Sequence, residues 1–279
     1  MPCVPSPGPA ASPPGNAMET NPVQLHCLGV GPGWPCPDRN GSAYLYQAGG
    51  LRLLCDCAEG ASRALKASGV GLEAIDRILL THLHFDHVGG LFFYLQGCWV
   101  ERRRDPLTIH LPAHGLPAVR EMLRQGFILD ELFPFELRWE PWEPGRTVDC
   151  EGVQVTPVPT THLDGLKQRH PTAMPAGAVA YAFEFRAAGK RWIHSGDVGS
   201  PADLAPLLEE PADLLLCEVA HIEPPSLFRF LAGRPVRRLV MTHLPVGLWD
   251  ERDRLLAEAR ARLPEIQVEL ATEGSRFEF

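Results

Sequence analysis

The sequence predicts an α/β protein folded as a four-layer αββα sandwich, in which two sheets pack together between outer layers of helices. Two observations lead to this fold class. Short alternating segments early in the chain indicate β-hairpins, and from residue 201 onward apolar strand-like segments alternate with helix-like ones. We expect one domain over residues 23–279, because no linker divides that range.

Residues 1–22 differ in composition from the rest of the chain. They are rich in Pro, Ala, Gly and Ser, and they lack the basic and apolar regions of a secretory signal. We expect a disordered tail there. Met18 is an alternative start, so the sequence leaves open whether residues 1–17 are translated.

Composition limits the possible functions of the chain. The 279 residues are 45% hydrophobic and 22% charged, which is typical of a globular protein. A net charge of −8 does not favour binding to extended nucleic acid. No apolar run is long enough for a membrane span. The eight cysteines form no CxxC pair, which favours a reduced, cytoplasmic protein.

In the first half of the chain, residue spacing distinguishes strands from helices. Residues 31–41 read as a Gly/Pro-rich loop, and Gly49–Gly50 indicate a hairpin turn. The expected strands are 23–30, 42–50, 51–57, 75–82 and 107–115. The expected helices are 61–67, 86–95 and 116–124.

In the second half, strands and helices alternate. The Trp- and Pro-rich section 127–145 gives no clear prediction, and a hairpin is expected around Gly189. The expected strands are 153–162, 178–185, 190–197, 213–219, 236–243 and terminal strands. One helix is expected to begin at Pro201, and two more are expected over residues 225–232 and 250–263.

The segment THLHFDHVGG, residues 81–90, carries the chemistry. In an extended backbone alternate side chains share one side, so His82 and His84 can reach one metal ion together. Asp86 and His87 follow where a helix begins, and the turn can direct them at a neighbouring ion. Three imidazoles suit Zn²⁺ with an open position for water, and two neighbouring metals can hold one hydroxide for hydrolysis.

Three further candidate ligands lie at the ends of predicted strands. His162, Asp197 and His243 each follow an apolar strand at its C-terminal end. Sites in α/β proteins assemble at those ends. The sequence therefore predicts that these residues complete the metal site begun by residues 82–87.

This pattern resembles the metallo-β-lactamase superfamily over residues 23–279. The resemblance implies two metal ions, which we expect to be Zn²⁺, with Mn²⁺ or Fe as alternatives. It implies that Asp197 bridges both ions and that Asp56 supports the site through hydrogen bonds. The implied ligands are His82, His84 and His162 for the first ion, and Asp86, His87 and His243 for the second.

Within the superfamily the chain resembles ribonuclease Z and its small phosphodiesterase relatives. The segments LGVGPGWPCPDRNGSAYL, LLCDCAEGASRAL and CEVAH carry this likeness. It implies that Glu218 and His221 assist protonation of the leaving oxygen. In the mechanism that we expect, Asp86 orients the attacking hydroxide or takes its proton. The alternatives are a packed histidine at a strand end for His221, and for Glu218 a strand-end carboxylate that pairs with a nearby basic residue.

One departure bears on the substrate. Ribonuclease Z proteins carry a long arm for gripping tRNA, most often between the third histidine and the bridging aspartate, but residues 163–196 here leave room only for a loop and a hairpin. We therefore expect a phosphodiesterase acting on a small phosphodiester or nucleotide-type substrate, through a hydroxide bridging two metals.

Other functions remain open from sequence alone. The same metals would serve a lactonase, thioesterase, sulfatase or β-lactamase-type hydrolase. A true RNA 3′-end endonuclease and a non-catalytic binding protein are further alternatives. The resemblance also implies a possible homodimer. The lack of a long apolar run argues against a membrane partner. It does not identify the natural substrate.

Overall fold

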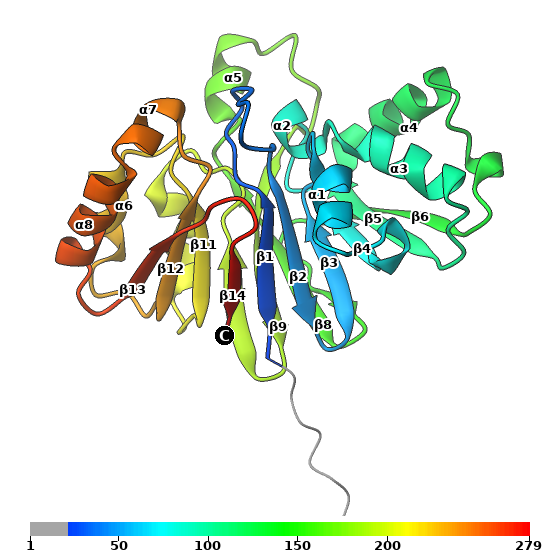
Figure 1. The fold of residues 1–279 in the computed structure, drawn as a ribbon. Helices are drawn as coiled ribbons and strands as arrows, with labels where there is room; N and C mark the ends of the chain where they lie inside the picture. The colour runs from blue at the N-terminus through cyan, green and yellow to red at the C-terminus, as the bar shows by residue number, and fades with distance from the viewer. Residues whose placement is uncertain (1–21) are drawn as a thin grey trace, which may run out of the picture.

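The computed structural model describes residues 22–279, so the tail predicted for residues 1–22 falls almost entirely outside the described residues. Two seven-stranded sheets form the centre of the described part. Figure 1 shows helices on the outer face of each sheet. The predicted four-layer αββα sandwich is confirmed.

The first sheet has the strand order β14-β1-β2-β3-β4-β5-β6. Strands β14, β1, β2 and β3 pair antiparallel, and β3 to β6 pair parallel. The strands are β1 (Gln24–Gly29), β2 (Ala43–Ala48), β3 (Leu51–Cys55), β4 (Arg77–Leu79), β5 (Leu107–Pro112), β6 (Leu137–Trp142) and β14 (Arg276–Glu278).

The second sheet has the order β13-β12-β11-β10-β9-β8-β7. Strands β7 to β10 pair antiparallel, and β10 to β13 pair parallel. The strands are β7 (Val148–Cys150), β8 (Val153–Thr160), β9 (Ala180–Ala187), β10 (Lys190–His194), β11 (Leu214–Glu218), β12 (Arg238–Thr242) and β13 (Gln267–Leu270).

Alternation along the strands separates two hydrophobic cores. In β2, Tyr46 packs against Phe185 and Trp192 of the second sheet, and Tyr44 packs against His194 of the same sheet. The intervening Leu45 packs instead with residues of the helices that cover the first sheet. Because successive side chains point to opposite faces, one strand contributes to both cores.

Helices complete the outer layers (Figure 1). Those on the first sheet are α1 (Ala61–Ala67), α3 (Leu91–Val100) and α4 (Leu116–Gln125). Those on the second are α6 (Pro224–Leu231) and α8 (Arg252–Arg262). Short helices are α2 (Phe85–Val88), α5 (Asp164–Arg169) and α7 (Val246–Asp250). The 3₁₀ turns are η1 (Leu72–Ala74), η2 (Ala113–Gly115), η3 (Asp130–Leu132) and η4 (Pro201–Leu208).

The structure differs from the expected elements in several places. The helix expected over 86–95 is two helices, broken at Gly89–Gly90, where a Cβ on Gly90 would lie 1.9 Å from the carbonyl oxygen of Ala58. Section 127–145, left without a prediction, contains β6. Residues 164–169, expected as a loop, form α5. No helix of the described residues is both long and apolar enough to cross a membrane.

Candidate metal centre

The predicted site residues follow strands of both sheets, at the strands' C-terminal ends. His82 comes after β4 of the first sheet. His162, Asp197 and His243 come after β8, β10 and β12 of the second sheet. The site is therefore assembled across the two sheets.

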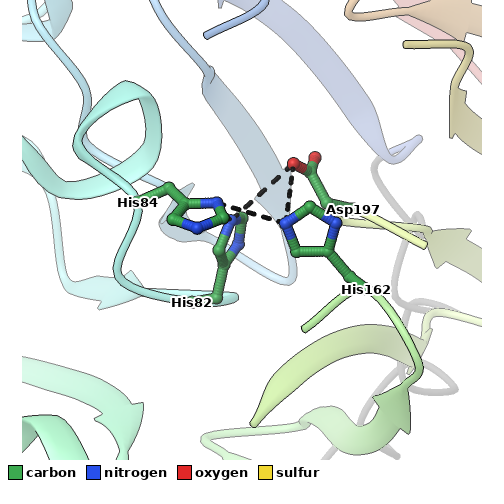
Figure 2. A group of neighbouring side chains, drawn as sticks. All are labelled: His82, His84, His162 and Asp197. Atoms are coloured by element: carbon green, nitrogen blue, oxygen red, sulfur yellow. Dashed lines mark hydrogen bonds and ion pairs between the residues drawn. The ribbon is translucent and has the colours of Figure 1, made fainter. Parts of the chain in front are cut away.

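The first set of side chains is His82, His84 and His162, together with Asp197 (Figure 2). Nδ1 of His84 lies 3.0 Å from Nε2 of His82 and 3.1 Å from Nε2 of His162. Oδ2 of Asp197 lies 3.7 Å from Nε2 of His82 and 3.6 Å from Nε2 of His162. Ligands of a tetrahedral zinc ion with bonds of about 2.0–2.1 Å lie about 3.3 Å apart, so these atoms need little movement to share one ion.

The second set is Asp86, His87 and His243. Oδ2 of Asp86 lies 3.6 Å from Nε2 of both His87 and His243. Oδ1 of Asp197 lies 3.3 Å from Nε2 of His87 and 3.7 Å from Nε2 of His243. The two carboxylate oxygens of Asp197 thus face different sets, as a residue that bridges two ions would.

Hydrogen bonds orient the imidazoles from behind. His87 Nδ1 donates to Oδ2 of Asp56 at 2.7 Å, and His82 Nδ1 donates to the hydroxyl of Thr81 at 3.0 Å, which itself donates to Asp56. Ser42 Oγ accepts from His243 Nδ1 at 3.0 Å. In each case the bond leaves Nε2 of the histidine free to face the site.

Sequence reasoning identified Asp56 through the family resemblance but missed Thr81 and Ser42. Thr81 directly precedes His82, so the motif itself offered a signal. Ser42 precedes the buried strand β2 and is itself buried, but its partner His243 is remote in sequence. No local pattern predicts that contact.

Electrostatics separate the two sets. Burial lowers the pKa of His82 and His84, and it lowers the pKa of His162 to about 4. These imidazoles are therefore neutral near neutral pH, as metal ligands must be. Burial also acts on His87, but the charges of Asp197 and Asp56 outweigh it and raise its pKa well above the usual value. A cation at the second set would replace the proton of His87.

Buried polar atoms without partners test whether metal ions fit. Within residues 22–279, Nε2 of His87, Nε2 of His243 and both carboxylate oxygens of Asp197 are buried without a hydrogen-bond partner. Leaving a buried polar atom unsatisfied costs about 1–3 kcal/mol, and more for a charged group. Cations bound between these histidine nitrogens and the oxygens of Asp197 would offset that cost. The donor set of five imidazoles and two carboxylates fits a pair of divalent ions.

Glu218 and His221 lie at the edge of this cluster. Glu218 ends β11, is buried, and accepts hydrogen bonds from the backbone N–H groups of Val198, Ala220 and His221. His221 Nδ1 lies 3.2 Å from Oε1 of Glu218 and 3.6 Å from Oδ2 of Asp197. The Glu218 carboxylate is buried, and the basic residue paired with it is His221.

A comparison with protein families places the chain. Residues 51–263 match the model of the beta-lactamase superfamily domain, a range that contains all seven predicted metal ligands. The chain belongs to this superfamily. The predicted likeness to the ribonuclease Z group is confirmed by curated relatives of that name.

Two such relatives differ in how much of their length is matched. Ribonuclease Z of Bradyrhizobium sp. (strain ORS 278) is 37% identical over 141 residues, which are 50% of this chain and 46% of the relative. Ribonuclease Z of Bradyrhizobium diazoefficiens is 26% identical over 293 residues, covering 88% of this chain and 96% of the relative. The stronger identity thus spans about half of each protein.

A solved structure supports the fold over nearly the whole chain. The metallo-beta-lactamase fold protein YhfI from Bacillus subtilis matches 93% of this chain and 100% of its own, with a TM-score of 0.74 and 19% sequence identity. At that identity the likeness concerns the fold.

Proposed function

We propose that this protein is a metal-dependent hydrolase that cleaves small phosphodiesters at a two-zinc centre. The observation that carries the proposal is the position of Asp197, whose two carboxylate oxygens face two separate sets of histidine nitrogens. Two-metal sites of this kind serve hydrolysis, and the ribonuclease Z relatives support phosphodiester chemistry.

The metal ions and the protein have separate tasks. When bound, two divalent ions lower the pKa of water and offset the negative charge that develops on phosphate oxygens. Zn²⁺ suits the imidazole-rich donor set best, and Mn²⁺ or Fe would also fit. The seven predicted ligands would hold the pair. Asp86, partly exposed to solvent, is placed to accept a proton from attacking water.

His221 is the candidate donor of a proton to the leaving oxygen. Burial lowers its pKa, but the hydrogen bond with Glu218 and the charge of Asp197 outweigh burial and raise the pKa above its usual value. Its side chain is 37% exposed, and Nδ1 faces Glu218, so Nε2 can serve a substrate. A protonated, oriented imidazole is what general-acid catalysis requires.

Two observations favour a small substrate over tRNA. Between His162 and Asp197 the chain forms only the helix α5, a following loop and the β9–β10 hairpin. The net charge of −8 opposes contact with a long polyanion. The second candidate is cleavage of RNA 3′ ends, favoured by the match along 96% of a ribonuclease Z.

We also propose a cellular compartment and an oligomeric state for the protein. The seven cysteines of the described residues are free thiols, which supports a reducing compartment such as the cytoplasm. A homodimer is proposed from the family resemblance.

The proposed function is tested with zinc-loaded protein and a panel of esters. We expect turnover of bis-p-nitrophenyl phosphate and none of a lactone, a thioester, an aryl sulfate or a cephalosporin. His84→Ala should lose zinc from the first set and most activity, as measured by elemental analysis and initial rates. His170→Ala, at an exposed position outside the cluster, is the control.

Three other results would favour a different function. Turnover of another ester alone would replace the substrate assignment. Cleavage of precursor tRNA at rates well above those for bis-p-nitrophenyl phosphate would favour the RNA candidate. If the purified protein retains no Zn, Mn or Fe after supplementation, the alternative of a non-catalytic binding protein is favoured.

A further inference from the structure

Exposed apolar side chains gather beside one half of the candidate metal centre. Large hydrophobic residues usually gain about 1.5–3 kcal/mol from burial, so their exposure at a site calls for an explanation. Trp34 is 69% exposed, Phe85 71% and Val246 44%. Phe85 directly precedes Asp86, and Val246 follows His243 by three residues. Trp34 follows Gly33, whose backbone lies close to Asp86.

Phe85 lies between two predicted ligands, His84 and Asp86, and begins α2. The helix turns His87 and Val88 inward, where both are buried, while the phenyl ring of Phe85 remains in solvent. The fold therefore does not use this ring for packing. It is an exposed ring on a residue that lies between two predicted ligands in the chain.

Trp34 is held near the same place by its loop. The loop is closed at its neck by a hydrogen bond from the N–H of Gly31 to the carbonyl of Asn40, at 2.8 Å. Its next part passes against the metal centre, since a Cβ on Gly33 would lie 3.1 Å from Oδ2 of Asp86. In Figure 1 this dark-blue loop rises to the end of the molecule where α2 and α5 lie.

The residues that follow the first ligand set in the chain have a different character. Helix α5 begins two residues after His162 and carries Asp164, Lys167 and Arg169. Lys167 pairs with Asp164 at 2.9 Å. The site is thus apolar and aromatic beside the second ligand set and charged beside the first.

We propose that Trp34 and Phe85 form a binding surface for a planar aromatic group of the substrate, a nucleobase or an aryl ester group. This inference rests on the proposed function, which places a phosphodiester at the metal centre. Aromatic side chains bind flat rings through their faces, and loss of one stacking partner weakens binding about 10-fold, within the range measured for bases. The surface would select phosphodiesters whose non-leaving group is aromatic.

The first experiment compares substrates that share a leaving group. Zinc-loaded protein is assayed with bis-p-nitrophenyl phosphate, with the p-nitrophenyl ester of thymidine 5′-phosphate, and with methyl p-nitrophenyl phosphate. For Trp34→Ala and Phe85→Leu we expect KM to rise about 10-fold on an aromatic ester with kcat unchanged, because the ring binds equally in ground and transition states. The methyl ester should be unaffected.

Matched controls separate binding from structure. Phe93→Ala removes a phenyl ring that is 69% exposed but lies on α3, away from the ligands, and should change nothing. Trp34→Phe and Phe85→Tyr retain a ring and should restore KM. An equal loss on all three esters, or loss of zinc, would overturn the proposal in favour of a structural role. A KM rise confined to the thymidine ester identifies a nucleobase, and one confined to the bis-aryl ester an aryl group.

A binding measurement tests the surface even without turnover. Calorimetry with AMP and with ribose 5-phosphate compares ligands that share a phosphate and differ in the base. We expect zinc-loaded protein to bind AMP about 10-fold more tightly, and Trp34→Ala to remove the difference. Equal binding of AMP and ribose 5-phosphate excludes a nucleobase as the bound group. Together with an unchanged KM on the bis-aryl ester, it refutes the aromatic surface. Preference for AMP without hydrolysis of any phosphodiester refutes the proposed function alone.

Discussion

Asp56 shows how one residue can support several ligands. Its buried carboxylate accepts hydrogen bonds from His87 and from Thr81, and Thr81 in turn accepts from His82. Its backbone has a φ of 57°, unusual for a residue other than glycine. A strained backbone of this kind is kept where the surroundings require it. Here it turns the carboxylate beneath imidazoles of both ligand sets.

His221 provides the prediction at the scale of single residues. Because a weakly basic leaving group departs without a proton, His221→Ala should scarcely affect p-nitrophenolate release. On a dinucleoside monophosphate, whose alkoxide needs a proton, kcat should fall about 10²–10⁴-fold. Zinc content, measured by elemental analysis, should not change.

His170→Ala serves as the control for this substitution, since His170 is exposed and outside the cluster. Loss of zinc in His221→Ala would make His221 a ligand, as its 3.6 Å approach to Asp197 would allow. An equal loss of kcat on both substrates would also contradict the role of proton donor.

The sequence predicted the members of the candidate site better than their supports. The seven ligand positions follow strand ends, where the chain pattern is readable, and the structure brings those side chains together. Contacts such as Ser42 with His243 depend on the pairing of distant segments. The residues around a buried serine in the sequence do not indicate which distant residue its hydroxyl will contact.

At the scale of elements, the loop from Gly31 to Asn40 depends on one remote carboxylate. Glu273 accepts hydrogen bonds from the N–H groups of Asn40 at 2.7 Å and Val30 at 3.4 Å. These bonds attach both ends of the loop to the segment between β13 and β14. The loop is therefore fixed at its neck while its tip stays exposed.

Glu273→Ala should release this loop. Hydrogen bonds to a charged group contribute about 1.5–3 kcal/mol, so their loss should open the neck without unfolding the sheets. We expect trypsin to cleave after Arg39 at least several-fold faster, as followed by mass spectrometry, and kcat/KM to fall.

Glu278→Ala is the matched control, because Glu278 is exposed on β14 and contacts Gln24 rather than the loop. The idea of a clamped loop fails if both variants are cleaved at the same rate.

Elements were predictable where apolar spacing was regular. The hairpin of β2 and β3 and the alternation after residue 201 are confirmed. The break between α2 and α3 was not foreseen, because close approach of Gly90 to Ala58 is a tertiary contact. Strand β6 has exposed and half-buried positions with a proline, so its sequence lacks the pattern of a buried strand.

At the scale of the whole molecule, buried histidines make stability depend on pH. Burial lowers the pKa of His26 to about 4, that of His110 to about 3 and that of His194 to about 4. Nearby Arg276 and Arg77 add to the effect at His26 and His110. In the unfolded chain these groups titrate near 6.5.

The sign of the pH effect follows from proton binding. Below about pH 6.5 these histidines bind protons in the unfolded chain but stay neutral in the folded protein. The free energy of unfolding therefore falls as the pH drops from 6.5 toward 4. Urea unfolding of metal-free protein at a series of pH values measures this. His110→Gln should reduce the slope, and His170→Gln should not. A slope that His110→Gln leaves unchanged would refute the explanation.

The pairing of β14 with β1 places the last residue of the sheet against the first. Val23 and Phe279 exchange two backbone hydrogen bonds, at 3.2 and 3.1 Å, and the C-terminus lies beside the start of β1 in Figure 1. The two ends of the described chain therefore lie side by side at one edge of the first sheet. A circularly permuted protein, joined there by a short linker and opened at the exposed turn of residues 143–146, would keep both sheets and reverse which half is synthesised first.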